Sequence, residues 1–141
     1  MRCMILLKAN ADSESGALPS QALLEAMGRY NEELVKAGVM RAGEGLKPTA
    51  EGARVRFSGE DRSVRPGPFA LDQGVICGFW IFEVASLDEA VDWVKRCPNP
   101  LEGEAEIEIR PVFEMTDFGD AMTPELRAQE ERMRTTIESK T

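Results

Sequence analysis

The sequence contains no histidine among its 141 residues. Without imidazole, the chain cannot form Ser-His-Asp or Cys-His triads, an HExxH metalloprotease site, or most zinc and non-haem iron sites. Phosphate-binding loops are also missing, because Gly43-Glu44-Gly45 continues into neither GxGxxG nor GxxxxGKS/T. No apolar run approaches the roughly 18 residues that cross a membrane. Neither a metal nor a cofactor is therefore expected, and the class of membrane proteins is excluded.

Positive charge is scarce as well, with 17 Lys and Arg against 25 Asp and Glu and a net charge of -8. An acidic chain repels a phosphate backbone, so nucleic acid is not expected as a partner. Cys3, Cys77 and Cys97 are odd in number and form no CxxC pair, which speaks against a disulfide framework or a metal knuckle. The N-terminal apolar segment stops at Lys8, before a signal-peptide core is complete. Reduced thiols in a cytoplasmic protein fit these observations.

What is present is the composition of one globular domain, with 43 % hydrophobic and 30 % charged residues. Residues 2–8 and 75–84 are apolar at nearly every position, which predicts two central strands covered on both faces. Ser20 caps a predicted helix over residues 20–37, which Gly38 ends. The apolar stripe of this helix consists of Leu23, Met27, Tyr30 and Leu34.

Further elements lie between and after these segments. Residues 39–47 predict a short strand interrupted by glycine. Apolar residues that alternate with arginine predict a hairpin over residues 53–65, an edge or an arm that is wet on one face. Ser86 and Glu89 form a capping box at the start of a second helix, which ends before Pro98.

The order of the elements predicts an α+β fold. Alternation over residues 106–113 adds a last strand, so that two strand-helix-strand units flank the hairpin. This is the ferredoxin-like, split βαβ topology over residues 1–120, with both helices on one face of the sheet. A second copy is expected to cover the other face, which gives a homodimeric α+β barrel. Thr123-Pro124 begins a helical tail over residues 121–141, and its thin apolar stripe predicts that it lies across its own or a partner's surface.

Several segments carry candidate functional groups. Pro66-Gly67-Pro68-Phe69 is a rigid corner, either the lip of a pocket or a connection between hairpin and strand. Lysine and arginine side chains are concentrated over residues 47–65. They bind a small anion or an acidic partner, or they form a solvated face. Glu83 is a candidate general base or a residue at the end of its strand. Glu106 and Glu108 share a face and are expected to be solvated.

Five runs agree in order and spacing with those of a known family. They are Ala42-Gly43-Glu44-Gly45-Leu46, Gly67-Pro68-Phe69-Ala70, Gly78-Phe79-Trp80, Val94-Lys95-Arg96-Cys97-Pro98-Asn99-Pro100 and Glu106-Ile107-Glu108-Ile109-Arg110-Pro111-Val112-Phe113. From about residue 1 to about residue 120, the chain resembles the DGPF, or YCII-related, family of small bacterial proteins. The resemblance implies the protomer and face-to-face pairing of the dimeric α+β barrel proteins. Some relatives are encoded beside, or fused to, extracytoplasmic-function sigma factors.

The chain departs from this family at its most polar positions. Pro66 replaces the aspartate of the Asp-Gly-Pro-Phe corner. The acid, threonine, lysine and acid that follow in the family are replaced by Leu71, Asp72, Gln73 and Gly74. Lys47 stands where relatives often carry a histidine before proline. If those groups perform acid–base work in relatives, this chain uses Lys47, Asp72 or Arg65 instead, or has lost the chemistry. Loss or an altered ligand preference is favoured.

The sequence therefore favours a protein that binds a small metabolite, with an anion among the candidates, in a barrel pocket lined by the corner and the third core strand. The expected ligand-binding residues are Lys47, Arg65, Gly67, Phe69, Asp72 and Trp80, and no catalytic residue is assigned. One alternative is a cofactor-independent isomerase or monooxygenase, by analogy of fold alone, which requires convergent polar groups in the pocket. The other is an interaction module for a transcription regulator, which requires an exposed apolar patch and no cavity.

Overall fold

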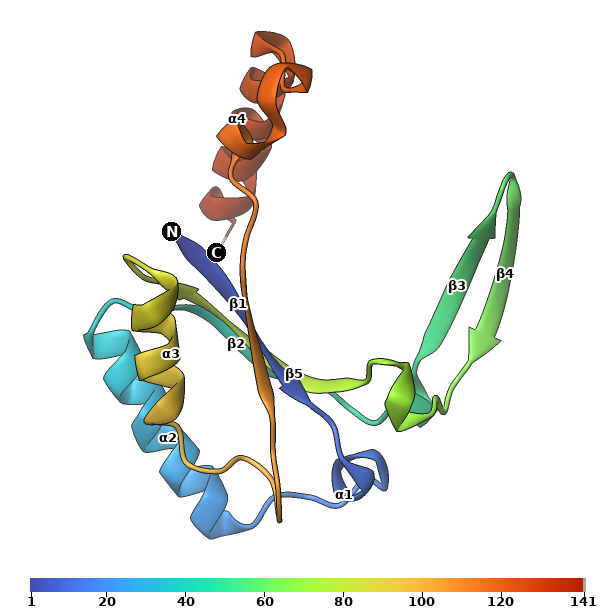
Figure 1. The fold of residues 1–141 in the computed structure, drawn as a ribbon, viewed down its shortest axis with the longest axis vertical. Coiled ribbons are helices and arrows are strands. Elements are labelled where there is room, and N and C mark those ends of the chain that lie inside the picture. Colours follow the sequence, from blue (N-terminus) through green and yellow to red (C-terminus); the bar gives the residue numbers. More distant parts are fainter. Residues whose placement is uncertain (141) are drawn as a thin grey trace. The chain divides into compact units, whose positions relative to one another are not determined.

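The computed structural model describes residues 1–140. The chain divides into two compact units, Met1–Pro111 and a second one that begins at Val112. The first unit contains a four-stranded antiparallel sheet in the order β2-β5-β1-β6. Its strands are β1 (Arg2–Lys8), β2 (Met40–Gly45), β5 (Ile76–Glu83) and β6 (Ile107–Pro111). Helices α2 (Gln21–Lys36) and α3 (Leu87–Lys95) lie on one face of the sheet, which confirms the α+β fold with ferredoxin-like strand order (Figure 1).

β1 and β5 lie at the centre of the sheet, as predicted. Successive side chains along each strand point to opposite faces. On the helix side, Ile5 and Phe82 are fully buried and Trp80 is 7 % exposed. On the opposite side, Met4 and Ile81 are register partners that remain half-buried. The sequence predicts that these strands are covered on both faces. Within one chain, only the face that packs against the helices is fully covered.

Both long helices of the first unit begin at the predicted caps. Ser20 accepts a hydrogen bond from the amide three residues ahead at the start of α2. Ser86 Oγ does the same at the start of α3, with the Glu89 amide at 3.1 Å. The predicted capping box is wrong in one detail, because the Glu89 carboxylate accepts from the amide of Ala85, at 2.6 Å, instead of that of Ser86.

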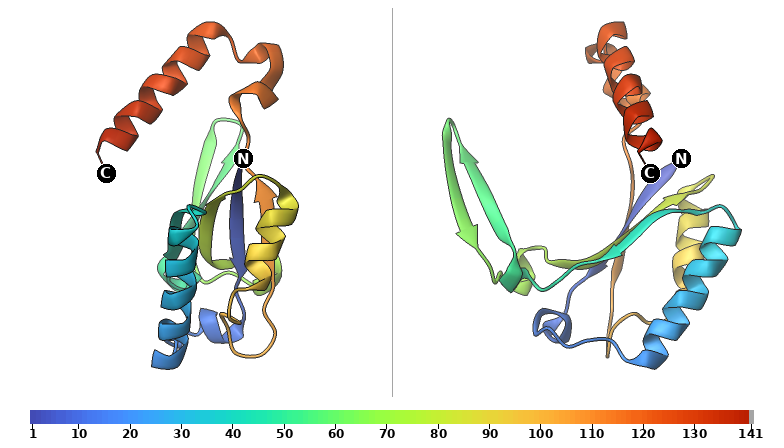
Figure 2. Two further views of the ribbon diagram at one scale, coloured as in Figure 1. Left: turned by 90° about the vertical axis from the view of Figure 1, so that its left-hand side faces the viewer. Right: turned by 180° about the vertical axis from the view of Figure 1, so that it is seen from behind.

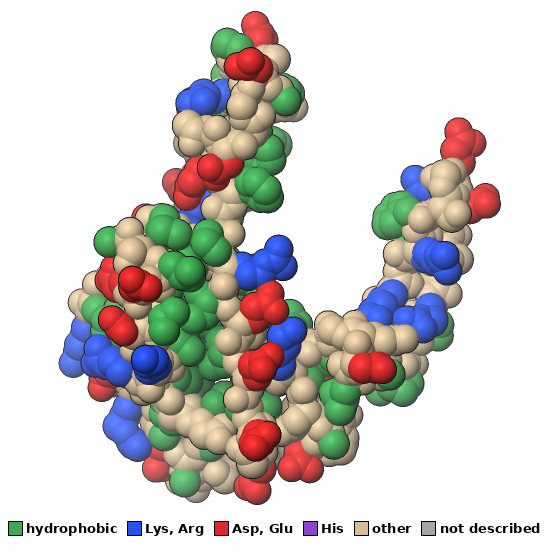
Figure 3. Space-filling view, viewed as in Figure 1, with side chains coloured by type: hydrophobic (Ala, Val, Ile, Leu, Met, Phe, Trp, Pro, Cys, Tyr) green, Lys and Arg blue, Asp and Glu red, His purple; other side chains and the backbone are tan. Residues whose placement is uncertain are grey.

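β3 (Ala53–Ser58) and β4 (Asp61–Pro66) form a separate two-stranded sheet, so the predicted hairpin is an arm. It projects from the four-stranded sheet on the side opposite to the helices (Figures 1 and 2). Register partners share a face, which places Val55, Val64 and Phe57 on one exposed face together with Arg62, whose guanidinium carbon lies 4.4 Å from the centroid of the Phe57 ring. The other face carries Arg54, Arg56 and Arg65. Figure 3 shows the basic side chains gathered along this arm.

The polar segment after β1 contains a short helix that the sequence pattern does not predict, α1 (Ala11–Glu14). Asn10 Oδ1 accepts from the Ser13 amide at 2.9 Å, and Ser13 Oγ accepts from the Asn10 amide at 3.0 Å. These reciprocal bonds specify a single turn without any apolar periodicity. The 3₁₀ segments within residues 1–140 are η1 (Thr49–Glu51), η2 (Leu71–Gln73) and η3 (Met115–Ala121).

Of three acidic or aromatic residues in the predicted strands, two lie at or beyond a strand end and one lies within a strand. Glu83 is the exposed last residue of β5, which confirms the interpretation as a strand end. Glu108 lies on the solvated side, with its carboxylate 3.3 Å from Lys8 Nζ. Phe113 lies outside the last strand, because β6 stops at Pro111.

The second unit consists of η3 followed by α4 (Pro124–Ser139). Thr123 Oγ1 accepts from the Leu126 amide at 3.2 Å, which confirms the predicted cap and the proline in the first turn. Leu126, Met133 and Ile137 are exposed along this helix. The surface on which the helix lies stays a prediction. In residues 1–140, no helix is both long and apolar enough to cross a membrane.

Candidate functional site

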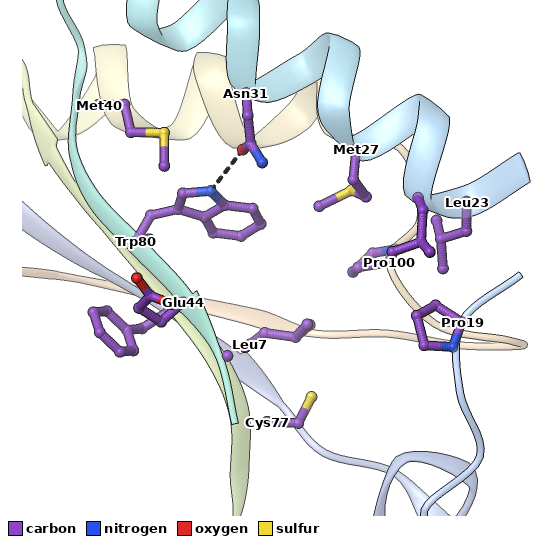
Figure 4. A pocket seen from close by; sticks show the side chains of 15 residues that line it. Leu7, Pro19, Leu23, Met27, Asn31, Met40, Glu44, Cys77, Trp80 and Pro100 are labelled. Atoms are coloured by element: carbon purple, nitrogen blue, oxygen red, sulfur yellow. Dashed lines mark hydrogen bonds between the residues drawn. The ribbon is translucent and has the colours of Figure 1, made fainter. Parts of the chain in front are cut away.

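A cavity of about 310 Å³ lies between α2 and the strands β2 and β5 (Figure 4). Its volume is at the lower end of the roughly 300–1,000 Å³ that small-molecule sites occupy. Most of the lining side chains are apolar. They include Leu7, Leu23, Met27, Met40, Trp80 and Pro100.

Glycines on two neighbouring strands leave this space open. Gly43 on β2 pairs with Trp80 on β5, and both positions face α2. Two residues further along β2, Gly45 pairs with Gly78 on the same face. A Cβ on Gly45 would have no atom within 4 Å, whereas one on Gly43 would meet Trp80 Cδ1 at 2.7 Å. The indole of Trp80 therefore lies against the backbone of β2. Beside it, Gly45 and Gly78 have no side chains, and the space that they leave is the cavity.

Trp80 forms one wall of the cavity and is held by its neighbours. Its Nε1 donates to Oδ1 of Asn31 on α2 at 3.0 Å. The Tyr30 ring meets the indole edge-on with centroids 6.0 Å apart, and the Phe82 ring lies at 6.3 Å. Tyr30 is fixed in turn, because its hydroxyl donates to the Trp93 carbonyl at 2.7 Å. The aromatic wall is therefore held in place by contacts within the protein.

Few polar groups reach the cavity. Asn31 contributes its side-chain amide. Glu44 also belongs to the lining, but it pairs with Phe79 on the sheet face opposite to Trp80. Burial raises the pKa of the Cys77 thiol, so this lining residue is neutral near pH 7. Within residues 1–140, no three His, Cys, Asp or Glu side chains gather in a way that could hold a metal ion. The lining suits an apolar molecule better than it suits acid–base chemistry.

The corner at Gly67 packs against η1. The Gly67 amide donates to the Gly52 carbonyl at 2.9 Å, and the Phe69 amide donates to Thr49 Oγ1 at 2.9 Å. A Cβ on Gly67 would lie 1.7 Å from the Thr49 carbonyl oxygen, closer than two such atoms can approach. Thr49 is tied to α1, because its amide donates to Glu14 Oε1 at 3.1 Å. These contacts favour the interpretation of the corner as a structural connection.

Two arginines of the hairpin stack on the aromatic ring of this corner. The guanidinium carbons of Arg54 and Arg65 lie 4.1 and 5.0 Å from the centroid of the Phe69 ring. Arg54 Nη2 also donates to the Gln73 carbonyl of η2 at 3.0 Å. The base of the hairpin is therefore fastened to the corner by cation–π contacts and one hydrogen bond.

The six expected ligand-binding residues fall into separate places. Trp80 lines the cavity, and the other five do not. Arg65, Gly67 and Phe69 meet at the corner, and Asp72 follows in η2. Lys47 lies between β2 and η1 in an exposed ion pair with Glu51. The corner does not line this cavity and is held against η1 instead. Ligand binding by the corner residues stays a prediction.

Sequence reasoning missed Asn31 and assigned Met27 to the core stripe. Both residues line the cavity from α2. The signal that points to them is the run of small residues on the facing strands, because Gly45 and Gly78 place no side chain opposite α2.

The fold and the cavity define a small α+β protein of ferredoxin-like topology with an apolar site between helix and sheet. The family model of the YCII-related domain matches residues 1–116, and the chain belongs to this family. It is also similar to an uncharacterized protein of Rhizobium meliloti (strain 1021), with 29 % identity over 92 residues. That match covers 65 % of this chain and 74 % of the relative.

Proposed function

We propose that this protein binds a small, largely apolar metabolite in the cavity between α2 and the sheet. The observation that carries the proposal is a volume of about 310 Å³ lined by apolar side chains and closed on one side by a fixed indole. Sites of this kind derive their affinity from apolar burial and their selectivity from a few polar groups.

The composition of the lining bears on the charge of the ligand. No lysine or arginine lines the cavity. An anion would therefore lose its hydration on entry without gaining a cationic partner. A neutral ligand is the form that this cavity supports, and an anionic group fits better at Arg54 and Arg65, where two guanidinium groups share the Phe69 ring.

The test is to purify the protein from cells, extract it with organic solvent and identify the released small molecules by mass spectrometry. Gly45→Leu places a side chain where a Cβ has no atom within 4 Å, inside the cavity. Gly28→Leu is the matched control, because a Cβ there also meets nothing within 4 Å but the position is exposed on α2. We expect a compound that co-purifies with the wild type and with Gly28→Leu and is depleted at least about tenfold in Gly45→Leu. Equal amounts in all three would contradict the proposal.

We also propose that the protein is a homodimer whose two sheets pack face to face. Met4, Leu6, Phe79 and Ile81 are half-buried side chains on the sheet face opposite to the helices. A contiguous apolar surface of this kind on a central sheet favours cover by a second copy of the same face.

An isomerase or monooxygenase receives less support. Such an enzyme needs polar groups that converge on the substrate. Of the three candidate groups Glu83, Glu44 and Lys47, Glu83 ends β5 in an exposed position and Lys47 lies outside the lining. Glu44 belongs to the lining, but its strand position faces the opposite side of the sheet.

A contact with a transcription regulator is the second candidate: exposed apolar side chains on the hairpin favour it, whereas the cavity of about 310 Å³ speaks against it. Val55, Phe57 and Val64 are 51 %, 68 % and 68 % exposed. Phe57→Ser should weaken binding to an extracytoplasmic-function sigma factor in a surface-plasmon-resonance titration. Ala121→Ser, outside the hairpin, is the control that should leave that binding unchanged.

A further inference from the structure

The hydrogen bond between Trp80 and Asn31 fixes the orientation of the asparagine amide. An indole N–H is a donor only and accepts nothing. The oxygen of the Asn31 amide must therefore face Trp80 Nε1, which lies 3.0 Å away. The amide nitrogen is then turned the other way, and Figure 4 shows it on the side of Met27, towards the cavity.

This nitrogen belongs to a half-buried side chain in a mostly apolar lining. Among the hydrogen bonds of the described residues, none has Asn31 Nδ2 as its donor, although Asn31 Oδ1 is paired. Around it the cavity presents Leu23, Met27 and Met40 together with the indole. A donor surrounded by such groups favours any bound molecule that brings an acceptor to it.

The remaining charge of the lining restricts what that acceptor is. Glu44 is the one charged residue of the lining, and it is acidic. Its strand position faces the opposite side of the sheet, so a carboxylate or phosphate on the ligand would lose its hydration inside the cavity without gaining a charged partner. A neutral carbonyl oxygen accepts from an amide without this cost.

We propose that the cavity selects molecules that carry a neutral carbonyl oxygen on an apolar body, such as ketones and esters, and that Asn31 determines this specificity by donating from Nδ2. The inference rests on the proposed function, because it names the chemical class that the same cavity takes. Trp80 contributes in two ways: its ring contacts the apolar body, and its N–H holds the amide in the donating orientation.

The test uses three probes of nearly equal size: 2-acetylnaphthalene, 2-isopropylnaphthalene and 2-naphthoate. Their dissociation constants are measured with the wild-type protein by equilibrium dialysis. One added hydrogen bond in an apolar site corresponds to about a tenfold change in affinity. We expect the ketone to bind about tenfold more tightly than the hydrocarbon, and the carboxylate to bind most weakly.

Asn31→Asp is the variant that isolates the donor. Its carboxylate still accepts from Trp80 Nε1, while the two N–H groups of Asn31 are gone. We expect this variant to lose the tenfold preference for the ketone and to keep its affinity for the hydrocarbon within about threefold. A wild-type measurement that needs no variant accompanies it: in a ¹⁵N–¹H spectrum, the side-chain amide proton of Asn31 should lie further downfield with 2-acetylnaphthalene bound than with 2-isopropylnaphthalene bound, because only the ketone accepts its hydrogen bond.

The outcomes separate this inference from the proposed function. If none of the probes binds, the ligand-binding function itself is overturned. If the ketone and the hydrocarbon bind equally, the cavity takes apolar molecules but the role of Asn31 is wrong. Tightest binding of 2-naphthoate would also overturn the inference and would favour an anionic ligand.

Discussion

Single glycine residues determine where this protein leaves space for a ligand and where its backbone packs tightly. Gly45 and Gly67 illustrate the contrast, because a Cβ on the first meets nothing within 4 Å and one on the second lies 1.7 Å from a backbone oxygen. The same residue type therefore leaves room for a ligand at one position and allows close packing at the other. A sequence pattern identifies both glycines without revealing which role each has, since the difference lies in the partner strand or turn.

Gly67→Ala should destabilise the fold. The added methyl group would force the corner away from Thr49. This movement would also break the hydrogen bond that the Phe69 amide donates to Thr49 Oγ1. We expect a loss of about 2–3 kcal/mol in the free energy of unfolding, measured by urea titration with tryptophan fluorescence. Gly45→Ala serves as the control and should change that free energy by less than about 1 kcal/mol. Equal losses in the two variants would show that the close packing of Gly67 against Thr49 does not contribute to the free energy of unfolding.

Cys97 links stability to pH in the alkaline range. Burial raises the pKa of the Cys97 thiol from 9.0 to about 11 in the folded protein. The unfolded chain therefore ionises first, so the thiol's contribution to stability is complete below pH 9 and is lost as the pH rises towards about 11. We expect the free energy of unfolding to fall less steeply over this interval in Cys97→Ala than in the wild type. Parallel pH profiles for the two proteins would contradict this.

At the scale of elements, hydrophobic periodicity predicts the long helix α2 and misses the short helix α1. The helix predicted over residues 20–37 is α2, Gln21–Lys36, because its apolar stripe and both ends are encoded locally. α1 has one turn, and its residues carry no stripe. Its stability comes from the Asn10 cap and from distant contacts, such as the bond from Asn10 Nδ2 to the Glu102 carbonyl at 3.2 Å. Such contacts cannot be read from neighbouring residues.

The candidate site was predictable in part for the same reason. Trp80 was identified because an aromatic residue on a central strand is a local feature. Asn31 was not, since its importance arises only when α2 crosses β5 and brings its amide within 3.0 Å of the indole. The corner residues have an unusual local sequence, but their contacts with η1 depend on the return of the chain to Thr49.

The hairpin should be the least protected regular part of the first unit. β3 and β4 pair only with each other, and most of their side chains are exposed. A two-stranded sheet is marginal in water, so local opening costs little free energy. We expect backbone amides of the hairpin to exchange with deuterium at least about a hundredfold faster than those of β1 and β5 in a mass-spectrometric exchange experiment. Protection equal to that of β5 would contradict a free arm and would indicate a partner on its apolar face.

At the scale of the whole molecule, the sheet is asymmetric. One face carries the helices and the buried core, with Ile5 and Phe82 fully buried, and the other presents half-buried apolar side chains. The sequence predicts strands that are apolar on both faces. Because the second face is also apolar, a second copy of the chain is expected to cover it. The structure of one chain does not specify what covers this face.

The last prediction concerns this open face. If two sheets pack against each other, sedimentation should give twice the 15.6 kDa mass of the chain at micromolar concentration. Ile81→Lys introduces a charge at the centre of the open face, beside Met4 and Ala42, and an unpaired charge in an apolar interface is costly. We expect this variant to sediment as a monomer, with dimer affinity reduced about a hundredfold or more. Val35→Lys, at a position 63 % exposed on α2, is the matched control and should remain dimeric. A wild type that stays monomeric at about 50 µM would contradict the dimer, because an interface of the size of one sheet face should be saturated at that concentration.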